Sequence, residues 1–120
     1  MQFYIYEEFE DFASVYSALV PKDFELIKNG GFKSFPERFF RYKNVNLMFS
    51  LDYAMKYARD SRNFPPKTIE THLIKFFVPL KKLNTFREPG SPISCIPTER
   101  LFEFNRSIVG YIERWEKITL

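Results

Sequence analysis

Cysteine, histidine and glycine are scarce in this chain. Cys95 is the single cysteine, so no disulfide can form within the chain, and a lone thiol is typical of a reducing compartment. His72 is the single histidine, and no CxxC, HxxxH or HExxH spacing occurs. The sequence therefore predicts no metal site and excludes a two-histidine ribonuclease. Gly30-Gly31 is placed to end a helix rather than to begin one, so a glycine-rich phosphate loop is absent.

Long apolar runs and a one-sided charge are also missing. No apolar stretch approaches the ~20 residues that span a bilayer, and Glu7, Glu8 and Asp11 interrupt the region where a signal peptide would be apolar. Lys and Arg number 18 against 15 Asp and Glu, a balance too even for a protein that coats a polyanion. We therefore expect a cytoplasmic protein of a bacterial or host cell, with no membrane partner, as a monomer or small homo-oligomer.

Aromatic residues, in contrast, are abundant. They make up 19% of the 120 residues, with 15 phenylalanines, and hydrophobic residues make up 45%. Burying an aromatic ring contributes a large favourable free energy to folding, so the chain is expected to be ordered. Its length predicts one domain over residues 1–120. Rings in excess of what a core needs can also lie on a surface that receives a partner.

The clearest local signal is the segment Val45–Asp60, VNLMFSLDYAMKYARD. A short apolar run ends at Ser50, and apolar or small residues then recur at Leu51, Ala54, Met55 and Ala58. That spacing is one face of a helix, and a serine in front of it can cap the free backbone N–H groups. The segment predicts a buried strand, a capping Ser50 and a helix.

The remaining segments predict an α+β fold with a small mixed or antiparallel sheet and flanking helices. Strands are expected where β-branched and aromatic residues gather, and helices where apolar residues follow helical spacing. The expected strands are Phe3–Tyr6, Thr68–Val78 and Leu80–Phe86. The expected helices are Phe12–Leu19, Lys22–Lys28 and Leu101–Trp115, the last with Thr98 as its cap, and Arg87–Pro97 is expected to be irregular.

A basic and aromatic stretch, Phe35–Lys43, offers a candidate binding surface. Arginine contacts phosphate and dominates interface hot spots together with aromatic rings. The candidate partner-binding residues, for a protein or nucleic-acid target, are Arg38, Arg41 and Tyr42, extended by Arg59 and Arg62. The alternative is that Phe39 and Phe40 belong to the core while the charges are solvated.

In order and spacing, VPKDFELIKNGGF, LMFSLDYAMKYARD and LIKFFVPL resemble the ADP-ribosyltransferase-like superfamily over residues 3–86. The resemblance implies a split sheet that binds NAD and no metal. It matches the superfamily's strand-end serine to Ser50 and its late catalytic glutamate most nearly to Glu99. It places Tyr4, Tyr6 and Tyr53 at the cofactor, with Tyr4 and Tyr6 where the superfamily has a first-strand Arg or His. Glu99 also suits the first turn of a helix, where a carboxylate favours the positive end of the helix dipole.

Two functions follow from these observations. One is an ADP-ribosyltransferase-like domain of the toxin or viral effector type, which modifies a macromolecular target with NAD. The other is a non-enzymatic inhibitor, of the anti-defence or immunity type, that acts through its arginine and aromatic surface.

Overall fold

The computed structural model describes residues 11–36, 45–88 and 90–120. Over these residues the elements run β1 Phe12–Leu19, α1 Pro21–Asn29, β2 Val45–Met48, α3 Leu51–Arg59, β3 Glu70–Pro79, α4 Leu80–Leu83, β4 Ile93–Ile96, α5 Leu101–Asn105 and β5 Val109–Thr119. Short 3₁₀ turns lie at Ser61–Asn63 and Thr98–Arg100. No helix in the described ranges is long and apolar enough to cross a membrane.

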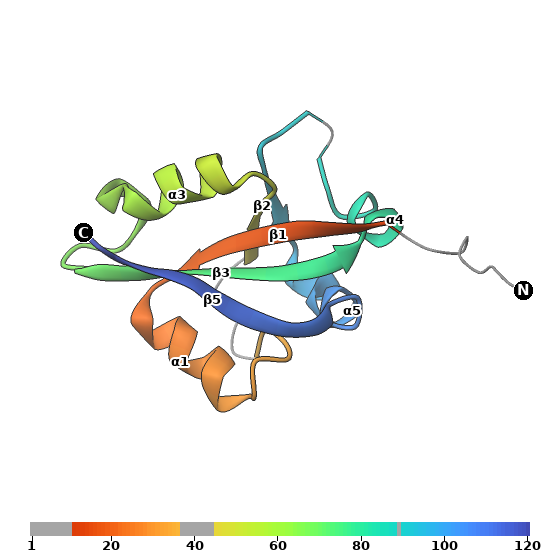
Figure 1. Cartoon of the computed structure of the whole chain (residues 1–120), viewed down its shortest axis with the longest axis horizontal. Coiled ribbons are helices and arrows are strands. Elements are labelled where there is room, and N and C mark those ends of the chain that lie inside the picture. The colour runs from red at the N-terminus through yellow and green to blue at the C-terminus, as the bar shows by residue number, and fades with distance from the viewer. Residues whose placement is uncertain (1–10, 37–44, 89) are drawn as a thin grey trace, which may run out of the picture.

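The five strands form one sheet in the order β4-β2-β1-β3-β5, and every neighbouring pair is antiparallel. The α+β class and the antiparallel sheet are therefore as predicted. Helix α3 covers one face, while α1 and α5 lie on the other (Figure 1).

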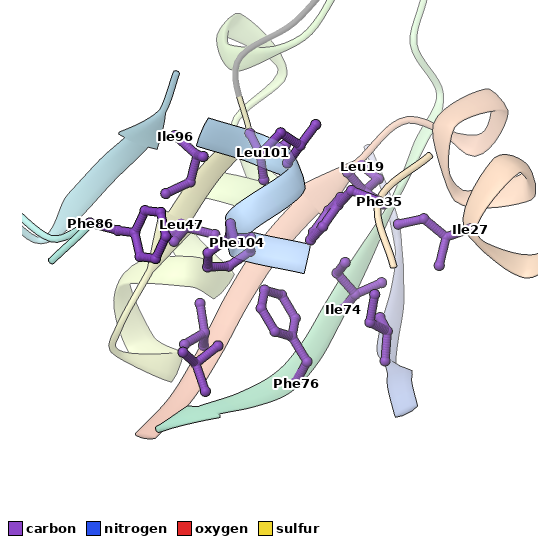
Figure 2. Close-up of a cluster of buried hydrophobic side chains, with 14 of the residues drawn as sticks. Leu19, Ile27, Phe35, Leu47, Ile74, Phe76, Phe86, Ile96, Leu101 and Phe104 are labelled. Atoms are coloured by element: carbon purple, nitrogen blue, oxygen red, sulfur yellow. The ribbon is translucent and has the colours of Figure 1, made fainter. Parts of the chain in front are cut away.

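The main core lies between the sheet and the helices α1 and α5. Phe35, Phe76 and Phe104 are almost fully buried there, and Phe76 meets the other two rings at centroid distances of 5.5 and 5.9 Å in edge-to-face geometry (Figure 2). Aromatic pairs favour this arrangement over a face-to-face stack. A smaller cluster under α3 joins Ala54 and Ala58 to Tyr16 and Leu73 and to residues of β2 and β5. Among the described phenylalanines, five are buried in the core, and Phe12, Phe77 and Phe102 are exposed.

Several predicted elements are confirmed. The helix expected over Lys22–Lys28 is α1, the strand and helix expected in Val45–Asp60 are β2 and α3, and the strand expected over Thr68–Val78 is β3. The strand expected over Phe3–Tyr6 lies outside the described residues.

Four predictions are wrong. The expected irregular segment Arg87–Pro97 contains strand β4, because Ile93–Ile96 pairs with β2. The other three fail because their apolar residues fit more than one period. Phe12–Leu19 is strand β1 rather than a helix, because it pairs with β3 along its whole length. Its apolar residues do not alternate with polar ones, since residues of both faces enter the two core clusters. Leu80–Phe86 contains the helical turn α4 rather than a strand. The expected helix Leu101–Trp115 ends at Asn105, and the chain continues as β5. Arg100, rather than the expected Thr98, is its N-cap residue, because Thr98 belongs to the preceding 3₁₀ turn.

Candidate functional site

The sheet is nearly divided between β1 and β2. Among the described residues the two strands share one registered pair, Tyr16 with Met48, whereas β1 pairs with β3 along its whole length. Beyond this pair the hydroxyl of Ser17 donates to the backbone carbonyl of Asn46 over 2.8 Å, so a side chain bridges the two strands. A cleft of about 310 Å³ opens where the strands separate. It is lined by Ser17, Ala18, Leu19, Val20, Asp23, Val45, Asn46, Tyr57, Asn63, Phe64 and Pro65.

Polar groups from three elements meet in this cleft. The Asn46 amide of β2 donates a long hydrogen bond of 3.5 Å to the Tyr57 hydroxyl of α3. The Asn63 amide, just after α3, donates to the backbone carbonyl of Tyr57 at 3.0 Å. Each amide keeps its side-chain oxygen and a second N–H for a ligand. The cleft therefore offers oriented donors and acceptors at its mouth.

Asp23 and Phe64 give the cleft its charge and its ring. Asp23 lies in the first turn of α1 and is buried, at 8% exposure, which is unusual for a carboxylate. The Phe64 ring packs edge-to-face on Tyr57, with centroids 5.9 Å apart. No lysine or arginine is among the described residues that line the cleft. A carboxylate and an aromatic ring in a lining of this kind suit a polar ligand that carries a cationic or neutral ring.

Ser50 caps α3, as the sequence predicted. Its hydroxyl accepts a hydrogen bond from the backbone N–H of Tyr53 at 3.3 Å, and its backbone is extended. Tyr53 is half-buried and packs against the cluster under α3. Both residues follow β2, at the opposite end of that strand from the cleft.

Ser50 and Glu99 lie at opposite ends of the β2–β4 ladder. Met48 pairs with Ile93 and Val45 pairs with Ile96, so Ser50 follows one end of the ladder and Glu99 follows the other. Glu99 is exposed in the 3₁₀ turn after β4, at the end of the sheet where Val45 lines the cleft. The register therefore brings Glu99 toward the cleft end and Ser50 away from it.

The predicted partner-binding arginines are described only in part. Arg62 is bound to Asp60 by two hydrogen bonds of 2.9 and 2.7 Å, and this contact lowers the pKa of Asp60 to about 2. Arg59 is exposed at the end of α3. Arg38, Arg41 and Tyr42, and the Tyr4 and Tyr6 of the NAD prediction, lie outside the described residues.

Sequence reasoning missed the cleft residues. Asn46 carries a signal in hindsight, because it is a polar residue inside the apolar run VNLMF. Asp23 carries another, because it shares the buried side of α1 with Phe24 and Ile27. Neither signal identifies its partners, since the contact of Ser17 with Asn46 joins residues 29 positions apart.

A second feature lies on the sheet face that α3 packs against, in the part that α3 does not cover. Phe77 and Trp115 are 39% and 43% exposed, and their rings lie 5.1 and 4.7 Å from the Lys75 ammonium. Phe12, 55% exposed, lies on the same face of the neighbouring strand, two residues before the cross-strand partner of Phe77. We call Phe12, Lys75, Phe77 and Trp115 the open aromatic face. Large exposed rings of this kind are typical of contact surfaces.

Comparison with known proteins gives no assignment. No family model matches the sequence, and neither curated proteins nor solved structures provide a match. Within the part of the chain that the structure describes, no group of His, Cys, Asp and Glu is placed to hold a metal ion.

Proposed function

We propose that the protein is a NAD-dependent transferase of the ADP-ribosyltransferase-like type, and that the nicotinamide half of NAD binds in the β1–β2 cleft. The observation that carries the proposal is the divided sheet, with a polar cleft at the division whose one charged lining residue in the described chain is a buried carboxylate, Asp23.

The residues of the cleft fit a nicotinamide nucleoside. The oxidised nicotinamide ring is a flat cation, which suits a carboxylate and the faces of aromatic rings. Asp23 supplies the carboxylate, Phe64 and Tyr57 supply rings, and the amides of Asn46 and Asn63 suit a carboxamide or ribose hydroxyls. A volume of about 310 Å³ lies at the small end of ligand pockets, which favours half of the dinucleotide over the whole.

When bound, NAD supplies the ADP-ribosyl group that passes to a nucleophile of the target. Asp23 is the cleft residue able to stabilise the positive charge that develops on the ribose as the nicotinamide bond breaks, because a fixed carboxylate in a partly dry site is already oriented. Glu99, at the same end of the sheet, remains our candidate for orienting the attacking group. Ser50 acts in this proposal only as the cap of α3.

Calorimetric titration tests the binding. We expect NAD and nicotinamide mononucleotide to bind and ADP-ribose to bind more weakly, because ADP-ribose lacks the cationic ring. Asp23→Asn should weaken NAD binding at least about tenfold, the loss expected for one charge-assisted contact. Asp52→Asn is the matched control, since Asp52 also lies in the first turn of a helix but is exposed and away from the cleft. Absence of heat with millimolar NAD, or equal losses in both variants, would refute the proposal.

A labelled-NAD transfer assay tests the chemistry. We expect label to pass from NAD to macromolecular acceptors in a cell lysate, and Glu99→Gln and Asp23→Asn to lower that transfer while leaving the melting temperature near that of the parent protein. Binding without transfer would contradict the transferase and leave only a nucleotide-binding site.

The second candidate, a non-enzymatic binding protein, is favoured by the open aromatic face. Its rings are exposed in a fold that has ample core, and exposed Phe and Trp suit a protein-binding surface. An inhibitor of this type would bind its target equally well with and without NAD, and Phe77→Ser with Trp115→Ser would weaken that binding. Asp23→Asn would leave it unchanged, which distinguishes the two functions.

A further inference from the structure

A groove separate from the cleft runs between α1 and β5. It has a volume of about 440 Å³ and is lined by Phe24, Lys28, Phe32, Ile112, Glu113 and Arg114. The backbone N–H of Ile112 donates to the carbonyl of Phe32 over 2.7 Å. This bond ties β5 to the segment that follows α1, so it fixes two of the residues that line the groove.

The floor of the groove is apolar and rigid. Phe24 and Ile112 are buried, at 6% and 2% exposure, and Phe32 is half-buried beside them. The Phe24 ring stacks on His72 with centroids 4.4 Å apart and meets Phe32 at 6.0 Å. Because Phe24 and Ile112 are almost fully buried, the apolar surface that the groove offers to a flat or aliphatic body is chiefly that of Phe32.

The rim of the groove is cationic. The Arg114 guanidinium lies 5.5 Å from the Phe24 ring, and Lys28 is exposed in the last turn of α1. Neither cation has a salt bridge within the described part of the chain. Glu113 also borders the groove, but it pairs across the strands with Lys75. Its side chain therefore lies on the face of the sheet opposite to the groove. Two cations above apolar rings complement a ligand that is anionic at one end and apolar at the other.

We propose that the α1–β5 groove binds a small amphipathic anion, an aromatic or aliphatic body with one carboxylate or sulfonate head. The apolar body lies on Phe32, over the buried Phe24 and Ile112, and the head lies between Lys28 and Arg114. This charge pattern is opposite to that of the cleft, whose charged residue is Asp23, so the two sites select different ligands.

Anilinonaphthalene sulfonate is a suitable probe, because it joins aromatic rings to one sulfonate. We expect saturable fluorescence enhancement with a single class of site, displaced by decanoate and not by decanol. Lys28→Glu and Arg114→Gln should each weaken the probe about tenfold, the loss of one charge-assisted contact. Both residues are exposed, so neither substitution removes a buried group, and a thermal melt confirms the fold.

Two controls match these variants in charge. Lys22→Glu makes the same change on the exposed side of α1 without bordering the groove. Arg106→Gln removes another guanidinium that lies over a ring, 5.9 Å from Phe102. We expect both controls to bind the probe as the parent protein does. Equal weakening in variants and controls, displacement by decanol as good as by decanoate, or binding untouched by Lys28→Glu and Arg114→Gln would overturn the proposal. NAD binding in the cleft is measured separately, so either proposal can fail alone.

Discussion

His72 is buried in β3 although its ring can take up a proton. Its Nε2 lies 3.1 Å from the Glu70 carboxylate, its Nδ1 has no hydrogen-bond partner among the described residues, and its ring stacks on Phe24. Desolvation, above all, lowers the pKa of His72 below its ordinary 6.5, and the positive charges of Arg114 and Lys117 act in the same direction against Glu70. The folded protein therefore holds this imidazole neutral.

A pH dependence of stability follows from the lowered pKa. In the unfolded chain His72 takes up a proton as the pH falls through about 6.5, while in the folded chain it does so only at lower pH. The free energy of unfolding should therefore fall as the pH drops below about 6.5. Urea denaturation at pH 7.5 and 5.5 measures the change, and His72→Phe should reduce it, because the ring stack is kept and the titrating group is lost. An identical pH dependence in parent and variant would contradict this account.

At the scale of elements, the sequence predicts correctly those features that depend on contacts between residues close together in the chain. The α3 helix and its Ser50 cap involve contacts within four residues, so the sequence alone was sufficient. The C-terminal strand was missed because Leu101, Phe104, Ile108 and Trp115 fit a helical period by chance. In the structure Leu101 and Phe104 belong to a one-turn helix, and Trp115 lies at an irregularity of β5. Pairing with β3 decided the outcome, and that pairing is not visible in a local window.

Gly110 lies within the expected helix Leu101–Trp115, at the start of the segment that is strand β5 in the structure. Its φ is +73°, a left-handed conformation at the start of β5 that other residues adopt only with strain, and no atom would touch an added Cβ there. Gly110→Ala should therefore lower the free energy of unfolding by about 1 kcal/mol through the backbone alone. Gly30→Ala is the control, because Gly30 has a φ of −86° and an added Cβ would make ordinary contacts of 3.5 Å. Denaturant melts of the two variants measure the difference, and equal stabilities would show that β5 can adjust at Gly110.

At the scale of the whole molecule, the site was less predictable than the fold. The α+β class and four of the elements, α1, β2, α3 and β3, follow from composition and period, but the cleft depends on β1 and β2 separating after one registered pair among the described residues. That separation brings together Ser17, Asp23, Asn46 and Tyr57, which come from four elements of the chain. A single sequence does not specify which neighbouring strands of a sheet separate from each other. The resemblance to ADP-ribosyltransferases stays a prediction, and the residues it selected, Ser50 and Glu99, follow opposite ends of the β2–β4 ladder.

The weak attachment of β2 to β1 also has a dynamic consequence. Among the described residues, the β2–β4 ribbon is joined to the rest of the sheet by one registered pair and the Ser17 hydroxyl, whereas β1, β3 and β5 are joined by long ladders. Hydrogen-bonded amides of the ribbon should thus exchange with deuterated solvent before those shared by β1 and β3. A ligand seated in the cleft would span this seam and slow the exchange of the ribbon toward that of the other three strands. A ligand bound between β1 and β2 would then also stabilise the contact between the β2–β4 ribbon and the other three strands.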